Sequence, residues 1–166
     1  MKELVINSKK NGTHTIFYDD EDHELVSKYK WCIIKDYNKF YARTRIRLLK
    51  GKQRQKTFTM HQLLLGFPTE LIDHVNGNGL DNTRKNIRVA TNSQNSRNIP
   101  PRKDKSTSSY KGVYWNKIDK KFVSRIYVDK KRISLGMYKD EIEAAKAYND
   151  AAKKHFGEFA YINPIP

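Results

Sequence analysis

The chain has 166 residues and carries 33 Lys and Arg against 18 Asp and Glu, which gives a formal net charge of +15 at pH 7. This charge favours a polyanionic partner, and nucleic acid comes before an anionic membrane surface because no apolar run approaches the roughly 20 residues that span a bilayer. A single cysteine, Cys32, excludes internal disulfides and multi-cysteine zinc sites, so we expect no structural zinc.

The first third of the chain predicts a β-rich segment. Thr15–Tyr18 has the composition of a strand, and Trp31–Ile34 predicts another. Between them, the acidic run Asp19–Asp22 supplies N-cap candidates for a short helix that continues towards Tyr29. Met1–Asn7 is followed by polar residues before the apolar core of a signal peptide could form, so we expect a protein that is not secreted.

The next stretch has the alternation of a β-hairpin. Residues 41–48 and 54–58 alternate in polarity, and Lys50–Lys52 supplies the turn. One face is basic and carries Arg43, Arg45 and Arg47. This face either contacts phosphates or is an ordinary solvated surface, and the pattern does not separate the two.

Residues 60–98 predict the order helix, strand, loop, strand, helix. A short helix is expected over 60–68, where Gly and Pro stop it. Leu71–Val75 and Asn86–Ala90 predict two strands around a polar loop that contains two Asn-Gly pairs. Thr91 is an N-cap candidate for a helix that carries Asn95.

This segment holds the groups that phosphodiester hydrolysis requires. Hydrolysis needs a base that takes a proton from water and a cation that neutralises charge on the phosphate. Asp73 and Asn95 offer oxygen ligands of the kind that Mg²⁺ accepts, and His74 is a base with an ordinary pKa of about 6.5. Adjacent residues of a regular strand point to opposite faces, so Asp73 and His74 share a site only if the strand bends there.

The same segment resembles the HNH motif of zinc-free, phage- and intron-encoded homing endonucleases. The residues that carry the resemblance are Met60-His61-Gln62-Leu63, Asp73-His74-Val75-Asn76-Gly77-Asn78, Asp81-Asn82, Asn86-Ile87-Arg88 and Asn95. The resemblance implies a ββα-metal fold in which Asp73 and Asn95 bind the metal, His74 is the general base and Asn86 holds the base-bearing loop by hydrogen bonds. His61 also matches a family position, where we expect a structural hydrogen bond rather than catalysis.

Residues 99–109 predict a linker because they combine prolines with small polar residues. It separates residues 1–98, with the nuclease motif at 60–98, from a second domain at 110–166. This domain predicts three strands, at 111–115, 122–128 and 132–135, and a helix that Asp140 and Glu143 cap and Gly157 ends. Alternation along the central strand puts Phe122, Ser124, Ile126 and Val128 on the helix-packing face, and Val123, Arg125 and Tyr127 on the other.

The second domain resembles the DNA-binding domain of plant ethylene-response factors. The resemblance rests on Tyr110-Lys111-Gly112-Val113, Phe122-Val123-Ser124-Arg125-Ile126, residues 132–138 and residues 143–149. It implies a sheet that enters the DNA major groove, with contacts at Lys111, Tyr114, Tyr127, Arg132 and Ser134. Several of these are Arg or Trp in the plant domains, so the base preference does not carry over. Charge, aromatic character and strand phase add Trp115, Lys117 and Arg125.

We therefore expect an α+β protein: a β-rich N-terminal segment with a ββα-metal nuclease core, then a small three-stranded antiparallel sheet packed on one helix. The expected function is site-recognising cleavage of double-stranded DNA, of homing or phage type, with one Mg²⁺ or Mn²⁺. We expect a cytoplasmic monomer with access to host or phage DNA. The alternative is a non-catalytic, sequence-specific DNA-binding regulator with an inactive HNH fold. The intact set of Asp73, His74, Asn86 and Asn95 argues against it.

Overall fold

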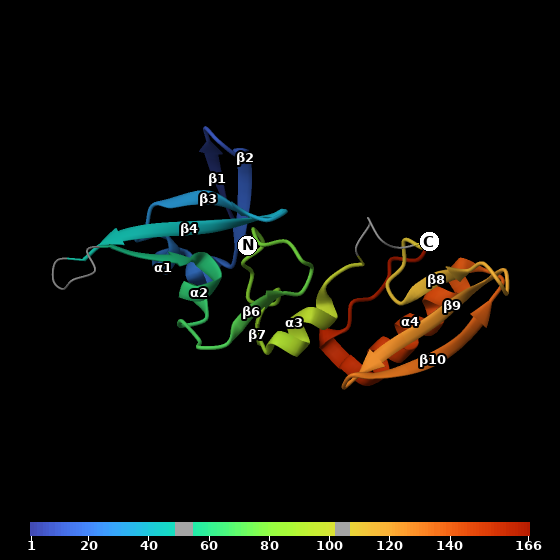
Figure 1. The fold of residues 1–166 in the computed structure, drawn as a ribbon. Helices are drawn as coiled ribbons and strands as arrows, with labels where there is room; N and C mark the ends of the chain where they lie inside the picture. The colour runs from blue at the N-terminus through green and yellow to red at the C-terminus, as the bar shows by residue number, and fades with distance from the viewer. Residues whose placement is uncertain (49–54, 102–106) are drawn as a thin grey trace. The chain divides into compact units, whose positions relative to one another are not determined.

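The computed structural model describes residues 1–48, 55–101 and 107–166, which form two compact units, Met1–Asn92 and Ser93–Pro166 (Figure 1). The turn expected at Lys50–Lys52, together with Arg54 and the centre of the expected linker, lies outside the described residues. No helix in the described part is long and apolar enough to cross a membrane.

The first unit begins with an antiparallel pair, β1 (Lys2–Ser8) and β2 (Gly12–Tyr18). The strand expected over Thr15–Tyr18 is confirmed within β2, whereas β1 was not expected. A 3₁₀ turn η1 (Asp20–Asp22) and helix α1 (His23–Ser27) follow. We expected one of the acidic side chains of this turn to cap the helix, but none makes a capping hydrogen bond to η1 or α1. Two of them, and Asp19 before them, bind Arg84 instead.

A three-stranded antiparallel sheet with strand order β3-β4-β5 comes next. Its outward face is basic, as expected, because Ala42 and Thr44 of β4 are buried while the intervening arginines point the other way. Helix α2 (Met60–Leu64) follows, and a capping box of Thr59 and Gln62 starts it. The strands are β3 (Trp31–Asp36), β4 (Lys39–Arg47) and β5 (Gln55–Thr59).

The two short strands expected around the polar loop are confirmed as β6 (Leu71–His74) and β7 (Ile87–Ala90). They pair antiparallel, with Asp73 opposite Arg88 and His74 opposite Ile87. The apolar core of the unit joins this hairpin to the earlier sheets through buried residues from β2, α1, α2 and β7. These include Ile16, Val26, Met60, Leu64 and Ile87.

Helix α3 (Asn92–Asn98) follows β7, so the expected strand-strand-helix order is present. The division between the two units falls after Asn92, inside this helix, and not in the 99–109 stretch that we expected to separate the domains. All of α3 beyond its first residue therefore belongs to the C-terminal unit.

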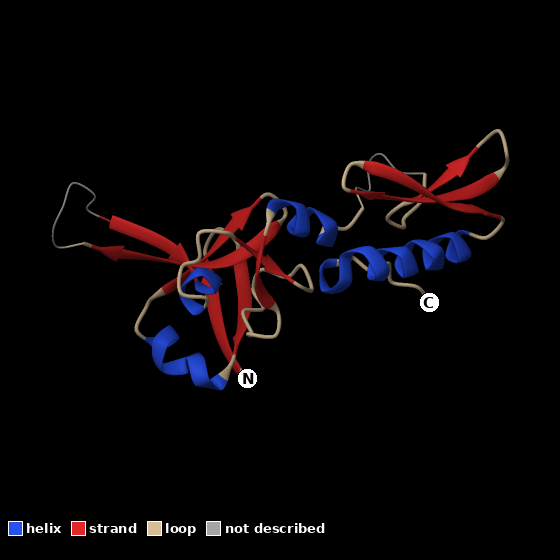
Figure 2. Cartoon of the chain, turned by 90° about the horizontal axis from the view of Figure 1, so that it is seen from below, coloured by secondary structure: helices blue, strands red, loops and turns tan. Residues whose placement is uncertain are grey.

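The C-terminal unit contains an antiparallel sheet with strand order β10-β9-β8, and helix α4 (Glu141–Phe156) lies along one face of it (Figure 2). The expected N-cap is confirmed, because the Asp140 carboxylate accepts a hydrogen bond from the Glu143 N–H at 2.9 Å. Gly157, at φ +54°, ends the helix before a 3₁₀ turn, η2 (Gly157–Phe159). The strands are β8 (Val113–Asn116), β9 (Lys121–Val128) and β10 (Lys131–Tyr138).

The sheet packs on α4 through the face that strand alternation predicts. Ile126 and Val128 contact the helix core around Tyr148 and Ala152, and Phe122 packs near Ala144 and Ala145. Gly112, just before β8, lies so close to α4 that an added Cβ would sit 2.0 Å from the Tyr148 ring, and its φ of +79° also favours glycine.

Candidate active site

Two histidines and a tyrosine from three different elements meet beside the β6–β7 hairpin. His74 ends β6, His61 lies on α2 and Tyr41 lies on β4. The centroids of the two imidazole rings are 5.0 Å apart, with an interplanar angle of 85°. The Tyr41 ring lies 6.0 Å from that of His74 and 5.7 Å from that of His61. His74 is therefore held in a pocket of aromatic rings, with 5% of its surface exposed.

His61 has the structural hydrogen bond expected of it. Its Nε2 lies 2.7 Å from Thr59 Oγ1, which fixes the ring against the start of α2. Its Nδ1 is buried and has no hydrogen-bond partner among the residues that the structure describes. His61 is thus an immediate neighbour of the expected base, which its distance of thirteen positions in the chain does not reveal.

Burial keeps both imidazoles neutral. It lowers the pKa of His74 to about 4, although the side chain of Asn82 and the nearby carboxylates act in the opposite direction. It lowers the pKa of His61 to about 3, and the neighbouring His74 adds to this effect. The ordinary value of about 6.5 assumed from the sequence is therefore wrong for His74, because the charged form of the ring would lose its hydration in this pocket.

Asp73, the residue before His74 in β6, carries a charge and is only 4% exposed. Its Oδ2 accepts hydrogen bonds from Arg88, at 2.8 Å from one terminal nitrogen and 3.1 Å from Nε. The Arg88 side chain is itself only 12% exposed, so this is a buried ion pair across the β6–β7 ladder. Asp73 and His74 belong to the same regular strand, and the turn begins only at Val75, so the bend that was needed to bring both side chains into one site is not present in β6.

Asn86 has the hydrogen bonds that a loop-holding role requires. Its Oδ1 accepts from the Asn76 N–H at 3.0 Å, and its Nδ2 donates to the Asp81 carbonyl at 2.7 Å. Its own carbonyl accepts from the Val75 N–H at 2.8 Å, directly after His74. One buried side chain thus joins the start of the loop to its far half.

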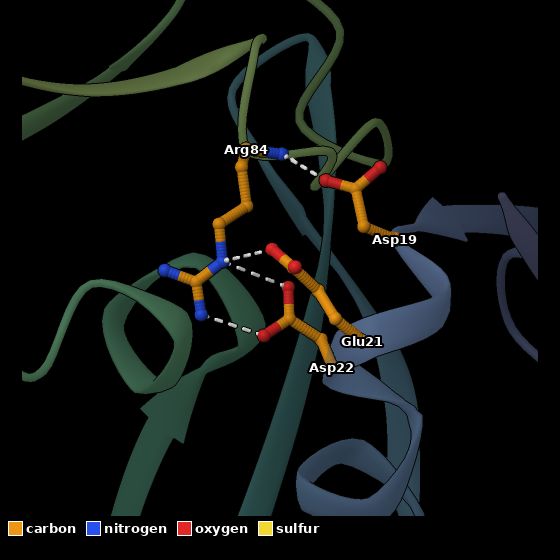
Figure 3. A network of polar contacts seen from close by, with 4 residues as sticks. All are labelled: Asp19, Glu21, Asp22 and Arg84. Atoms are coloured by element: carbon orange, nitrogen blue, oxygen red, sulfur yellow. Dashed lines mark hydrogen bonds and ion pairs between the residues drawn. The ribbon is translucent and has the colours of Figure 1, made fainter.

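The far half of the loop is fixed to the N-terminal strands as well. The Phe17 N–H donates to the Leu80 carbonyl, and the Asn82 N–H donates to the Phe17 carbonyl, at 2.9 and 2.8 Å. Arg84 continues this anchoring (Figure 3): its backbone N–H donates to Asp19, and its guanidinium binds Asp22 at 2.6 Å. The loop after His74 is therefore held both by Asn86 and by its hydrogen bonds to the N-terminal segment.

Gly79 lets the loop approach β4 closely. A Cβ at this position would lie 2.5 Å from the Phe40 carbonyl oxygen and from the Tyr41 ring. Tyr41, which sequence reasoning missed, thus packs between the loop and the two histidines. The feature of the sequence that could have pointed to Tyr41 is strand alternation, which places it on the same face of β4 as Arg43, Arg45 and Arg47.

The other expected metal ligand, Asn95, lies on α3 in the C-terminal unit, whereas Asp73 belongs to the N-terminal unit. The Asp73–Asn95 pair therefore stays a prediction. Among residues 1–48, 55–101 and 107–166, no three His, Cys, Asp or Glu side chains gather closely enough to hold a metal ion. Any ion at Asp73 needs ligands of other kinds, such as amide, water or phosphate oxygens.

In the C-terminal unit, the expected DNA contacts do not all lie on one face. Strand pairing places Arg132 opposite Tyr127, Ser134 opposite Arg125 and Tyr114 opposite Val123, so these residues share the face that α4 leaves uncovered. Trp115 pairs with Phe122, and their rings meet edge to face at 4.8 Å, so its strand phase is that of the helix-packing side. Lys117 is exposed in the turn after β8.

Lys111 is the clearest departure from expectation. Its ammonium group donates to the carbonyls of Arg97 and Ile99, at 2.6 and 2.7 Å, near the end of α3. Burial lowers its pKa to about 8. A lysine placed this way ties α3 into the C-terminal unit, so its charge is already engaged within the protein.

The chain is thus a mixed α/β protein with a carboxylate and a neutral imidazole at the base of a braced loop. No family model matches it. Over 144 residues it is 33% identical to a protein of Acanthamoeba polyphaga mimivirus named as an uncharacterized HNH endonuclease, and the match covers 85% of this chain and 70% of that protein. At this identity and coverage, the chain belongs to the HNH endonuclease family.

Proposed function

We propose that this protein is a metal-dependent DNA endonuclease in which His74 is the general base. The observation that carries the proposal is the position of Asp73 and His74, consecutive and buried at the end of β6, where Asn86 fixes the loop that follows. Membership of the HNH endonuclease family supports the same reaction class.

The neutral state of His74 suits proton abstraction. With a pKa of about 4, the ring is unprotonated at cellular pH and can accept a proton, although it is a weaker base than a group whose pKa lies near the operating pH. As the water oxygen attacks phosphorus, its proton passes to the imidazole, and the bond to the leaving sugar oxygen breaks. His61 and Tyr41 position the ring, so that little orientational freedom is lost when the substrate arrives.

Asp73 is the residue of the N-terminal unit that would hold the cation. A carboxylate is the hard oxygen ligand that Mg²⁺ or Mn²⁺ prefers, and the resemblance adds the amide oxygen of Asn95 as the second protein ligand. When bound, one such ion supplies charge neutralisation at the phosphate and the leaving oxygen. In its absence Arg88 supplies the positive charge that a buried carboxylate requires.

DNA phosphates have a basic surface next to this site. Arg43, Arg45 and Arg47 follow Tyr41 on the same face of β4, and Thr59, which contacts His61, pairs with Arg43. Alternate residues of a strand are roughly 6.6–6.8 Å apart, so each guanidinium can reach a different phosphate. A DNA strand whose phosphates bind these arginines in turn would extend towards His74. Of the two readings left open for this face, its continuity with the site favours phosphate contact.

The C-terminal unit would set the position of cleavage. Its uncovered sheet face carries Tyr114, Arg125, Tyr127, Arg132 and Ser134, and the resemblance to ethylene-response-factor domains implies that this face would enter the major groove. Lys111 is withdrawn from this set because its ammonium group binds α3. With one proposed ion site per chain, we expect a monomer that nicks one strand.

Plasmid cleavage tests the proposal. Supercoiled plasmids that carry a random insert library are incubated with the full-length protein and Mg²⁺ or Mn²⁺, and the ends are mapped by sequencing. We expect nicks at a preferred site that disappear when EDTA is added. Tight binding without any metal-dependent nick would favour the alternative, a regulator with an inactive HNH fold.

A further inference from the structure

A cavity of about 650 Å³ opens in the C-terminal unit and gathers five of the residues that were expected to touch duplex DNA. Its aromatic and basic lining includes Tyr114, Trp115, Tyr127, Arg97, Lys111 and Arg125. We propose that this cavity binds one unpaired nucleobase of DNA together with its phosphate. The proposal concerns binding alone and does not depend on His74 or on a metal ion.

The aromatic walls suit the flat face of a base. Tyr114 and Tyr127 flank Arg125, whose guanidinium carbon lies 4.4 Å from the first ring centre and 5.7 Å from the second. Tyr127 is 55% exposed, so part of its side chain is accessible to a ligand. Bases stack on aromatic rings and guanidinium planes whatever their sequence, because every base has a π face.

The concave shape favours an unpaired base over a duplex. Bases inside a duplex are stacked on their neighbours and present only their edges in the grooves. A cavity lined by rings can use a base face only after that base has left the stack. The volume lies within the range of about 300–1,000 Å³ that is typical of small-molecule pockets, which leaves room for a base with its sugar.

Charge at the cavity suits the phosphate of the same nucleotide. Arg125 carries a guanidinium whose described partners are the two tyrosine rings, so its N–H groups can bind phosphate oxygens. Arg97 lies over the Phe156 ring at 4.6 Å, and its ion pair with Asp129 is long, at 3.4 Å, and exposed. Lys111 shapes the wall and does not bind the ligand, since it is held by the α3 carbonyls.

The walls are fixed before any ligand arrives. Lys111 fastens the end of α3, the Trp115 N–H donates to Thr107 Oγ1 at 2.8 Å, and the Trp115 ring rests on Phe122. A preformed cavity loses little conformational entropy on binding, which favours affinity for a ligand as small as one nucleotide.

A pair of matched ligands tests the proposal. One fluorescent duplex carries a single bulged nucleotide, and its partner carries an abasic bulge at the same position, so the two differ in one base. A second pair uses single strands with and without one abasic position. Binding of the full-length protein is measured by anisotropy in EDTA, which prevents any metal-dependent cleavage.

We expect the bulged base to bind about 5- to 150-fold more tightly than the abasic bulge, the range that corresponds to stacking of one base. Tyr127→Ala and Arg125→Gln should remove most of this ratio. Met137→Ala is the matched control, because Met137 is 54% exposed on the same sheet face and does not line the cavity. Circular dichroism confirms that each variant is folded.

If only the bulged duplex binds more tightly than its abasic partner, the ligand is an extruded base. If only the single strand binds more tightly than its abasic partner, the ligand is a single-stranded segment. Equal affinity for base and abasic ligands in both pairs would overturn the proposal. So would a ratio that persists in folded Tyr127→Ala and Arg125→Gln. Because no cleavage is measured, either failure leaves the proposed nuclease function untouched.

Discussion

The imidazole rings of His61 and His74 stand edge to face, with their centroids 5.0 Å apart. Neither ring can take up a proton easily, because burial lowers the pKa of both and the neighbouring His74 lowers that of His61 further. Thr59 fixes His61, and His61 in turn limits the orientations of His74. The base of the proposed reaction is therefore positioned by a residue from a different element, thirteen positions earlier in the chain.

This pair makes the stability of the protein depend on pH. The pKa values of His61 and His74 are about 3 and about 4 in the folded protein, below the value of about 6.5 in an unfolded chain. Between these values the unfolded chain binds more protons, so stability falls as the pH drops from about 6.5 towards 4. His61→Phe keeps a ring in place and removes one of the two groups, so we expect a shallower fall. Urea unfolding from pH 4.5 to 7.5 measures the free energy of unfolding at each pH. An equal dependence on pH in the wild type and in His61→Phe would contradict the account.

Arg88 should matter most when no divalent ion is bound. Arg88→Gln leaves the buried Asp73 carboxylate without its ion-pair partner, and loss of one partner of a buried pair costs about 3–5 kcal/mol. We expect a large fall in melting temperature in EDTA, with partial recovery in Mg²⁺ or Mn²⁺ that exceeds any effect on the wild type.

The double variant Asp73→Asn/Arg88→Gln is the control for Arg88, because it removes both charges. It should melt at a higher temperature than Arg88→Gln and gain nothing from the ions. If the ions stabilise both variants equally, Asp73 is not where they bind.

Asn86 offers a way to test the loop without touching His74. Asn86→Ala removes the acceptor for the Asn76 N–H and the donor to the Asp81 carbonyl, each a part-buried hydrogen bond. We expect a loss of about 1–3 kcal/mol in stability for a group left unsatisfied and a fall in single-turnover cleavage rate. Asn86→Asp keeps the acceptor but sets a buried carboxylate oxygen against the Asp81 carbonyl, so it should lose at least as much stability. A stable Asn86→Ala protein with the wild-type rate would remove Asn86 from the loop-holding role.

The number of phosphates that the β4 arginines contact can be measured from the salt dependence of DNA affinity. Each phosphate contact contributes about −0.9 to the slope of log affinity against log salt for duplex DNA. Arg45→Gln/Arg47→Gln should therefore flatten the slope by about 1.8 if each residue binds one phosphate. Lys153→Gln/Lys154→Gln removes the same charge from exposed positions on α4, in the other unit, and should change the slope little. Identical slopes in the two double variants would show that the basic face is merely solvated.

Local patterns in the sequence predicted the elements that carry the site. Alternation and the Asn-Gly pairs predicted β6, the loop and β7, and the capping residue Asp140 predicted the start of α4. Strand β1 was missed because its apolar run is short and one of its apolar residues, Val5, is 57% exposed.

Contacts between distant residues were not predictable in the same way. The burial that lowers the pKa of His74 comes from elements that pack around it, including α2 and β4. The role of Lys111 depends on carbonyl groups twelve and fourteen positions earlier, at the end of a helix. Arg84 binds acidic residues more than 60 positions away, so its network appears only in the fold.

Single-turnover cleavage by His74→Ala, with plasmid in excess of its dissociation constant and Mg²⁺ present, tests the central claim most directly. His74 is the proposed proton acceptor and makes no proposed phosphate contact, so we expect cleavage to fall by about 10²- to 10⁴-fold while affinity for DNA measured in EDTA stays within a factor of a few. A variant that binds DNA and cuts it at the wild-type rate would contradict the account.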